Sequence, residues 1–201
     1  MSSFAQRSSF HDGDASTRIA AIFQKHGWNI SVIGQESDTK KLSSSLKEKN
    51  DQTSLMLRYR PDKVATRPGF NTIFVEIKTA ITTSENYAIE FRSWEFTSLW
   101  NPSGENVCYV FLDSNQENIP LACWGKDIPP PRRVRVPGRW DQNEQIKRIF
   151  KRLPPDEQTH RPNVSIEVCN YYGVGSGTAF FLLPKTSNFL IPLPEFLGRI
   201  V

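Results

Sequence analysis

The sequence predicts an α/β domain in which helices flank a mixed β-sheet. Apolar residues recur at helical spacing within residues 14–26, where Ile19 and Phe23 fall on one face. Two β-branched and aromatic runs, at residues 72–78 and 106–113, are typical of buried strands. Helical and extended patterns therefore alternate along the chain, as they do in an α/β fold.

The first half of the chain continues this alternation after the opening helix. We expect a strand at residues 28–33, behind the glycine that ends the helix, and then a polar, Ser- and Lys-rich loop at residues 36–53. Strands at residues 54–62 and 72–78 lie on either side of a Pro-Gly turn. These two strands form a candidate hairpin.

The second half supplies a further set of elements and a division of the chain. In chain order we expect a helix at 85–100, strands at 106–113 and 119–124, a helix at 141–153, strands at 164–169 and 177–184, and a short helix at 194–201. We therefore assign residues 1–153 to the main domain. Residues 154–201 form a β-rich C-terminal extension that packs on the same domain.

Composition limits the classes of protein to consider without selecting one. The formal net charge of +4 suits a polyanionic partner but does not require one. Three cysteines, at positions 108, 123 and 169, are odd in number and widely spaced, which argues against a zinc site or a disulfide framework. The first eleven residues lack the apolar stretch of a signal peptide, and no run approaches the roughly 20 apolar residues of a membrane span. We expect a soluble, cytoplasmic protein without a membrane partner.

The candidate hairpin carries the residues with the clearest chemical potential. Hydrolysis of a phosphodiester needs charge neutralised on the phosphate and a water made nucleophilic, and Mg²⁺ does both when carboxylates hold it with open positions. Asp62 ends one predicted strand, and Glu76 lies 14 residues later within the next. In a tight hairpin these two carboxylates can sit side by side at one edge of the sheet. Each residue taken singly is more often a turn residue or part of a solvated face.

Lys78 extends the pair of carboxylates to a set of three. It lies two residues beyond Glu76, so strand alternation places both side chains on one face. A lysine there can orient the attacking water or stabilise charge that develops on the phosphate. Ile77 points to the other face, into the core, while its carbonyl can still ligate a metal. Two acids and one lysine on an apolar strand pair are costly unless they serve a purpose.

These residues carry a resemblance to a known superfamily. The segment Pro61-Asp62, followed by Glu76-Ile77-Lys78, resembles the signature of the PD-(D/E)XK nucleases, which include restriction endonucleases, Holliday-junction resolvases and recombination exonucleases. The restriction-endonuclease-like core of that superfamily is a helix, three strands, a helix and a strand around a mixed sheet. The predicted order matches this core over residues 12–113.

The resemblance also implies roles for individual residues. Asp62 and Glu76 would bind Mg²⁺, for which Mn²⁺ can substitute, with help from the Ile77 carbonyl. Lys78 would assist the attacking water. Catalysis would then rest on Asp62, Glu76 and Lys78.

Two further acids match the superfamily less closely. Many members place another metal-binding acid on the first helix, where Asp14 is the best match, although Asp14 can equally be the N-cap of that helix. Many also carry a polar residue on the helix that follows the lysine. Glu90, four residues before Trp94, stands where one branch has the Gln of a Gln-xxx-Tyr motif, and departs from it. Glu90 is therefore an auxiliary candidate, with a plain surface charge as the alternative.

A basic stretch supplies a candidate surface for nucleic acid. Arg132, Arg133 and Arg135 lie in the proline-rich segment before the predicted helix at 141–153, which carries further lysines and arginines. Such clusters contact phosphates in nucleic-acid-binding proteins, although they also occur as ordinary solvated faces.

The sequence thus leads to one primary hypothesis and one alternative. The primary hypothesis is a Mg²⁺-dependent deoxyribonuclease that cuts DNA as an endonuclease, with a homodimer as one way to cut both strands of a duplex. The alternative is a non-catalytic module that binds nucleic acid or protein on a degenerate nuclease fold. RNA in place of DNA stays open at this point.

Overall fold

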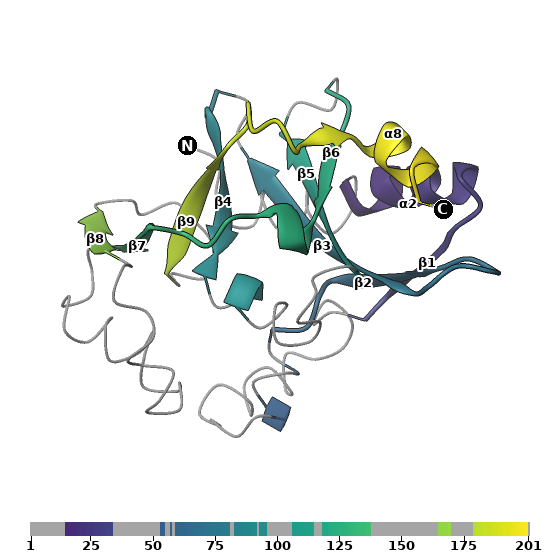
Figure 1. The fold of residues 1–201 in the computed structure, drawn as a ribbon, viewed down its shortest axis with the longest axis horizontal. Helices are drawn as coiled ribbons and strands as arrows, with labels where there is room; N and C mark the ends of the chain where they lie inside the picture. The colour runs from purple at the N-terminus through teal and green to yellow at the C-terminus, as the bar shows by residue number, and fades with distance from the viewer. Residues whose placement is uncertain are drawn as a thin grey trace.

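The chain forms a strand-rich, mixed α/β structure with two β-sheets (Figure 1). It is seen in a computed structural model, which describes residues 15–33, 53–54, 57, 59–80, 83–91, 93–95, 106–114, 118–137, 165–169 and 179–200. The predicted α/β class with a mixed sheet is confirmed. Strands outnumber helices in the described part of the chain.

The larger sheet has six strands in the order β1-β2-β3-β5-β6-β10. The strand pairs are antiparallel except β3 and β5, which run parallel and make the sheet mixed. β3 lies near the centre, with β2 on one side and β5 on the other. The six strands are β1 (Asn29–Val32), β2 (Lys63–Thr66), β3 (Ile73–Ala80), β5 (Val107–Asp113), β6 (Leu121–Trp124) and β10 (Ile191–Pro192).

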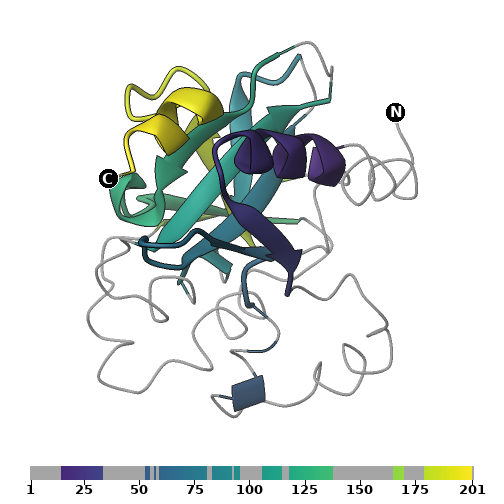
Figure 2. The same cartoon turned by 90° about the vertical axis from the view of Figure 1, so that its right-hand side faces the viewer.

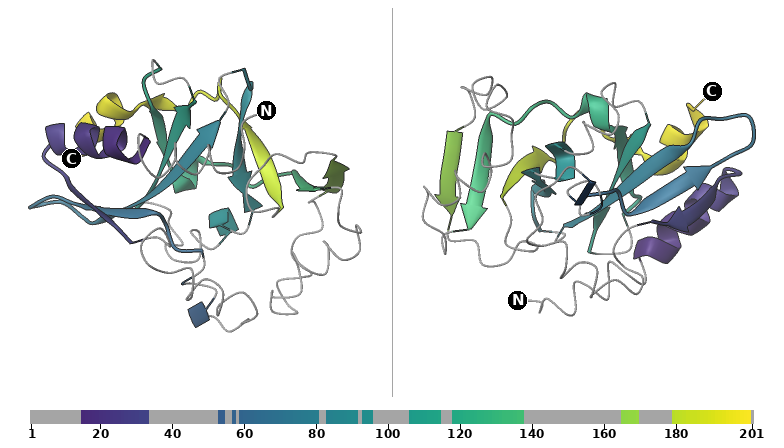
Figure 3. Two further views of the ribbon diagram at one scale, coloured as in Figure 1. Left: turned by 180° about the vertical axis from the view of Figure 1, so that it is seen from behind. Right: turned by 90° about the horizontal axis from the view of Figure 1, so that it is seen from below.

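The smaller sheet has four strands in the order β4-β9-β7-β8. These are β4 (Asn86–Glu90), β9 (Phe180–Pro184), β7 (Arg133–Pro137) and β8 (Ser165–Cys169). β9 comes from the C-terminal part of the chain and pairs antiparallel with β4. β7 and β8 form a parallel pair at the end of the molecule away from α2 (Figure 3). The smaller sheet therefore joins segments that are far apart in the sequence.

Two helices cover one face of the larger sheet. α2 (Ser16–Lys25) and α8 (Leu193–Gly198) lie side by side over this face (Figures 1 and 2). The α2 residues Ile19 and Phe23 are buried there, as their helical spacing predicts. A short 3₁₀-helix, η2 (Gly125–Asp127), follows β6. None of the helices in the described ranges is long and apolar enough to cross a bilayer.

The two faces of the larger sheet belong to two separate apolar cores. On β3, Val75 and Ile77 join the core beneath α2 and α8. The other face of β3 looks toward the smaller sheet, and Phe74 packs there beside Tyr109 and Phe111 of β5. Because strand side chains alternate between faces, Glu76 and Lys78 project from the second face. The polar pair thus lies on the side of the sheet that faces β4 and β9.

The hairpin forms, but its first strand is displaced from the predicted position. The prediction of a strand at residues 54–62 is wrong, because residues 53, 54 and 57 are helical and residues 59–62 are not extended into a ladder. The strand is β2, which begins directly after Pro61-Asp62. Proline has no backbone N–H to donate to a ladder, which favours a position at or before the start of a strand.

The predicted helix at residues 85–100 is wrong in its first part. Residues 86–90 form β4 instead, and the described residues from 91 to 95 are helical. Tyr87, Ile89 and Phe91 are buried against the second core, which is an alternation with the period of a strand. Burial of this alternating face against the larger sheet outweighs the helical spacing of the same segment.

Several other expectations fall on residues outside the described ranges. These are the helix at 141–153, almost all of the loop at 36–53, and Asp14. The strands predicted at 28–33, 72–78, 106–113, 119–124, 164–169 and 177–184 are confirmed to within three residues at each end, as are the first and last helices. β7 was not predicted as a strand.

Two buried cysteines provide a test of both cores. Cys108 lies beneath the helices and Cys123 lies between the sheets, and burial raises the pKa of each thiol. Since the thiolate is the reactive form, a raised pKa and the lack of solvent access both slow alkylation. We expect iodoacetamide at pH 8 to leave Cys108 and Cys123 unmodified in the folded protein and to label both in urea. Mass spectrometry of tryptic peptides measures this, and rapid labelling of either thiol in buffer would contradict the packing.

Candidate active site

Asp62 is held at the start of β2, opposite Glu76. The hairpin pairs Lys63 with Val75, and the same register continued by one residue sets Asp62 across from Glu76. Residues directly opposite on antiparallel strands share a face. The Asp62 carbonyl accepts a hydrogen bond from the Ile33 backbone (3.1 Å), which ties this end of β2 to the chain after β1. The register therefore brings the two predicted carboxylates to one end of the hairpin.

Glu76 is a buried carboxylate, with only 4% of its surface exposed. Its Oε1 accepts a hydrogen bond from the Ser93 hydroxyl (2.9 Å) and pairs with Lys78 Nζ (2.7 Å). Its Oε2 is also buried, and no described residue donates a hydrogen bond to it. Both observed partners thus hold the same oxygen, while the second oxygen keeps its acceptor capacity.

Lys78 is held in its charged form by the carboxylates around it. Burial by itself would lower the pKa of Lys78. The charges of Glu76, Glu90 and Asp62, together with the hydrogen bond to Glu76, more than reverse that effect. The net pKa lies above that of an ordinary lysine. At neutral pH this side chain is a cation and a hydrogen-bond donor.

Glu90 reaches the site from a different element than predicted. It is the last residue of β4 rather than a residue on a helix. β4 crosses close to β3, and this crossing brings Glu90 to the site. Its charge is one of the three that raise the pKa of Lys78. Asp62, Glu76, Lys78 and Glu90 therefore form one electrostatic group, which we call the hairpin cluster.

The Ile77 backbone faces the same edge of β3 as Asp62. Asp62 Oδ2 accepts a hydrogen bond from the Ile77 N–H at 2.7 Å. The backbones of Phe74 and Ala80 bond instead to the chain at the two ends of β5, so even-numbered residues of β3 face β5. In a strand the N–H and C=O of one residue point to the same side. The Ile77 carbonyl is thus directed toward the Asp62 edge, as a shared ligand set would require.

The described metal-ligating atoms at this site are few. Nowhere in the described ranges do three or more His, Cys, Asp or Glu side chains gather as a ready ligand set. Asp14, the predicted third acid, lies outside those ranges. α2, which follows Asp14 in the chain, covers the Ile77 face of the sheet, opposite to the face of Glu76. The site therefore offers the carboxylates of Asp62 and Glu76 and the Ile77 carbonyl.

The predicted arginines lie in and beside β7, in the other sheet. Arg133 and Arg135 both approach Glu167 of β8, with nitrogen–oxygen distances of 3.5 and 3.3 Å. Arg132 is exposed, and its carbonyl accepts hydrogen bonds from Ser165. Glu167 offsets one of the three positive charges, so the net charge of the stretch is smaller than the sequence suggests.

Ser93 is the residue at the site that the sequence did not single out. It is 5% exposed and lies on the helical residues after β4, 17 positions from the glutamate that it contacts. No local spacing links a serine to a glutamate at that separation. The sequence carries no signal that distinguishes Ser93 from the other serines.

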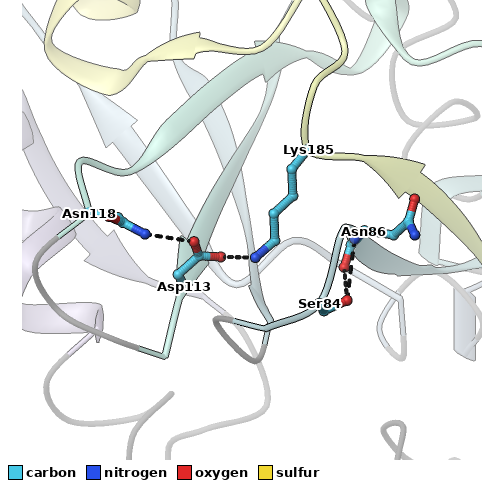
Figure 4. A network of polar contacts seen from close by, with 5 residues as sticks. All are labelled: Ser84, Asn86, Asp113, Asn118 and Lys185. Carbon is cyan, nitrogen blue, oxygen red and sulfur yellow. Dashed lines mark hydrogen bonds and ion pairs between the residues drawn. The ribbon is translucent and has the colours of Figure 1, made fainter.

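A second polar group joins the two sheets at the C-terminal end of β5 (Figure 4). Asp113 accepts hydrogen bonds from Lys185 Nζ (2.5 Å) and Asn118 Nδ2 (2.9 Å). Burial, followed by the charge of Asp113 and a hydrogen bond to it, raises the pKa of Tyr87. Lys185 Nζ also lies 5.2 Å from the centre of the Tyr87 ring. The group links β5, β4 and the end of β9, which is a structural role.

The chain matches no protein-family model and no curated protein.

The Asp113 group predicts an asymmetric effect of two substitutions on stability. Asp113→Ala removes the acceptor and leaves the Lys185 ammonium mostly buried, so we expect a loss of about 3 kcal/mol in the free energy of unfolding. Lys185→Met should lose only about 1 kcal/mol, because Asp113 keeps the Asn118 amide and the Tyr87 hydroxyl as donors. Urea unfolding followed by circular dichroism measures both variants. Equal losses would contradict the assignment of Asp113 as the centre of the group.

Proposed function

We propose that the protein is a Mg²⁺-dependent deoxyribonuclease that cleaves phosphodiester bonds in DNA as an endonuclease. The observation that carries the proposal is the hairpin cluster, in which a buried glutamate, an aspartate and a charged lysine meet at one end of β2 and β3. Perturbed, buried ionisable groups of this kind concentrate at functional sites.

The order of elements supports a restriction-endonuclease-like core. α2, then β1, β2 and β3, then the helical residues around 93–95, and then β5 follow the order helix, three strands, helix, strand. β1, β2 and β3 are antiparallel neighbours, and β5 runs parallel to β3. β4 and the helical residues 53, 54 and 57 are additions to that order. The signature residues fall at the β2–β3 hairpin, as the resemblance to PD-(D/E)XK nucleases implies.

The donor set suits a hard divalent cation. Asp62, Glu76 and the Ile77 carbonyl supply oxygen ligands, which Mg²⁺ and Mn²⁺ prefer. Glu76 Oε2 is a buried acceptor with no hydrogen bond from the described residues, which is the state expected of an oxygen reserved for a cation. When bound, Mg²⁺ neutralises phosphate charge and lowers the pKa of a coordinated water.

Lys78 contributes a fixed positive charge rather than a base. Its raised pKa favours the protonated form near neutral pH, which suits a hydrogen-bond donor rather than a base. Its ammonium can hold the attacking oxygen by a hydrogen bond and offset charge that builds on the phosphate. Glu90 helps to keep Lys78 charged when the Glu76 carboxylate binds the cation.

The basic residues supply a weaker argument for the substrate. Arg132 and Arg133 are exposed on the smaller sheet, and phosphate contacts from such residues position DNA without reading its sequence. Glu167 reduces this charge. We therefore assign these arginines a supporting role in holding the DNA backbone.

Cleavage of DNA in the presence of a divalent cation is the direct test. We expect purified protein to nick or linearise plasmid with Mg²⁺ or Mn²⁺ and to do nothing in EDTA. Glu76→Ala and Lys78→Ala should lower the cleavage rate at least about 100- to 1000-fold, because each removes a group that stabilises the transition state. Ser187→Ala, which removes a hydroxyl hydrogen bond after β9, serves as a matched control.

Circular dichroism melts establish that the variants are folded. Wild-type protein that cleaves neither plasmid nor linear DNA in either metal would end the proposal. Full activity in both Glu76→Ala and Lys78→Ala would contradict the assignment of the active site, although the nuclease activity itself would stand.

A module that binds without cleaving is the second candidate, and one contact favours it. The 2.7 Å pair of Glu76 and Lys78 satisfies both charges internally, as a purely structural pair would. Calorimetric titration with Mn²⁺ separates the two functions. We expect heat from a site that Glu76→Gln abolishes, because the neutral amide is a weaker ligand. DNA affinity without any Mn²⁺ heat in the wild type would favour the binding module.

A further inference from the structure

Ser93 is fixed in place from both sides. The backbone N–H of Phe91 donates to the Ala179 carbonyl (2.9 Å), which ties the start of the helical residues to the chain before β9. The Trp94 ring packs against Phe91 (6.1 Å between centroids) and edge-on against Phe181 (5.7 Å). These contacts anchor the residues on either side of Ser93 to the smaller sheet. The serine hydroxyl can therefore act as a rigid donor.

The two partners of Glu76 differ in how they respond to a cation. Lys78 carries a positive charge, so a divalent ion beside Glu76 repels it. The Ser93 hydroxyl is neutral and donates a hydrogen bond whether or not a cation is near. Of these two contacts to Oε1, the serine hydrogen bond is the one that would persist if the carboxylate bound a metal.

We propose that Ser93 is a positioning residue that holds Glu76 by Oε1, so that Oε2 is presented to the divalent cation. The inference rests on the proposed nuclease function and deepens it. One oxygen of the carboxylate is occupied by a fixed donor, and the other is buried with no described donor. A carboxylate held in this way acts as a monodentate ligand with a fixed orientation. Partners that orient metal ligands typically change metal affinity or activity 10- to 100-fold when removed.

The experiment compares Ser93→Ala, Ser93→Thr and the Ser187→Ala control in Mn²⁺ calorimetry and in plasmid cleavage. We expect Ser93→Ala to weaken Mn²⁺ binding about 10- to 100-fold. Its cleavage rate should recover as Mn²⁺ is raised, with an unchanged KM for DNA, which loss of fold would not produce. Ser93→Thr, which keeps the hydroxyl, should bind within a few-fold of wild type. If Ser93→Ala does not fold, Ser93→Cys takes its place, since a thiol is a weak donor.

The outcomes separate the inference from the function on which it rests. A wild type that binds Mn²⁺ and cleaves, together with a Ser93→Ala variant of equal Mn²⁺ affinity, overturns the inference alone. A cleavage defect in Ser93→Ala that excess Mn²⁺ does not relieve also overturns it. A wild type that neither binds Mn²⁺ nor cleaves overturns the proposed function, and the role of Ser93 falls with it.

Discussion

The register of the β2–β3 hairpin is the constraint on which the rest of the structure depends. Pairing of Lys63 with Val75 sends Val75 and Ile77 toward the helices and leaves Glu76 and Lys78 toward the smaller sheet. A shift of one residue would exchange the two faces, burying charges beneath α2 and exposing the aliphatic side chains. The parallel pairing of β3 with β5 fixes the other edge of the same strand. The fold and the hairpin cluster are thus set by one alignment.

Strands with both faces buried were the most predictable parts of the fold. β3 and β5 read as near-continuous apolar runs, because each face lies against a core. The segment from Tyr87 to Phe91 was not predictable in the same way. The longer segment 85–100 carries a helix period, while Tyr87, Ile89 and Phe91 carry a strand period, and only packing against the larger sheet decides between them. The sequence does not predict β7, because Val134 alternates with charged arginines in a proline-rich segment that is typical of a loop.

The candidate site likewise combines residues whose proximity follows from local sequence spacing with residues that only the tertiary fold brings together. Asp62, Glu76 and Lys78 come from one hairpin, so their spacing in the sequence reports their spacing in the fold. The helical position predicted for Glu90 is wrong, since Glu90 lies on a strand, yet its charge still acts on Lys78. Ser93 reaches Glu76 only because β4 folds back beside β3, and no local pattern encodes that approach.

The energetics of Glu76 argue that its burial serves something other than stability. A buried ion pair contributes little net stability, since the loss of hydration offsets most of the attraction. Phe74 and Ala80 occupy the same face of β3 at the flanking even-numbered positions and pack in the second core. Apolar residues at positions 76 and 78 would extend that core without burying a charge. The chain instead places a carboxylate there, supplies a serine and a lysine to one of its oxygens, and leaves the other with no described donor. This unequal treatment of the two oxygens is what the proposed cation site requires.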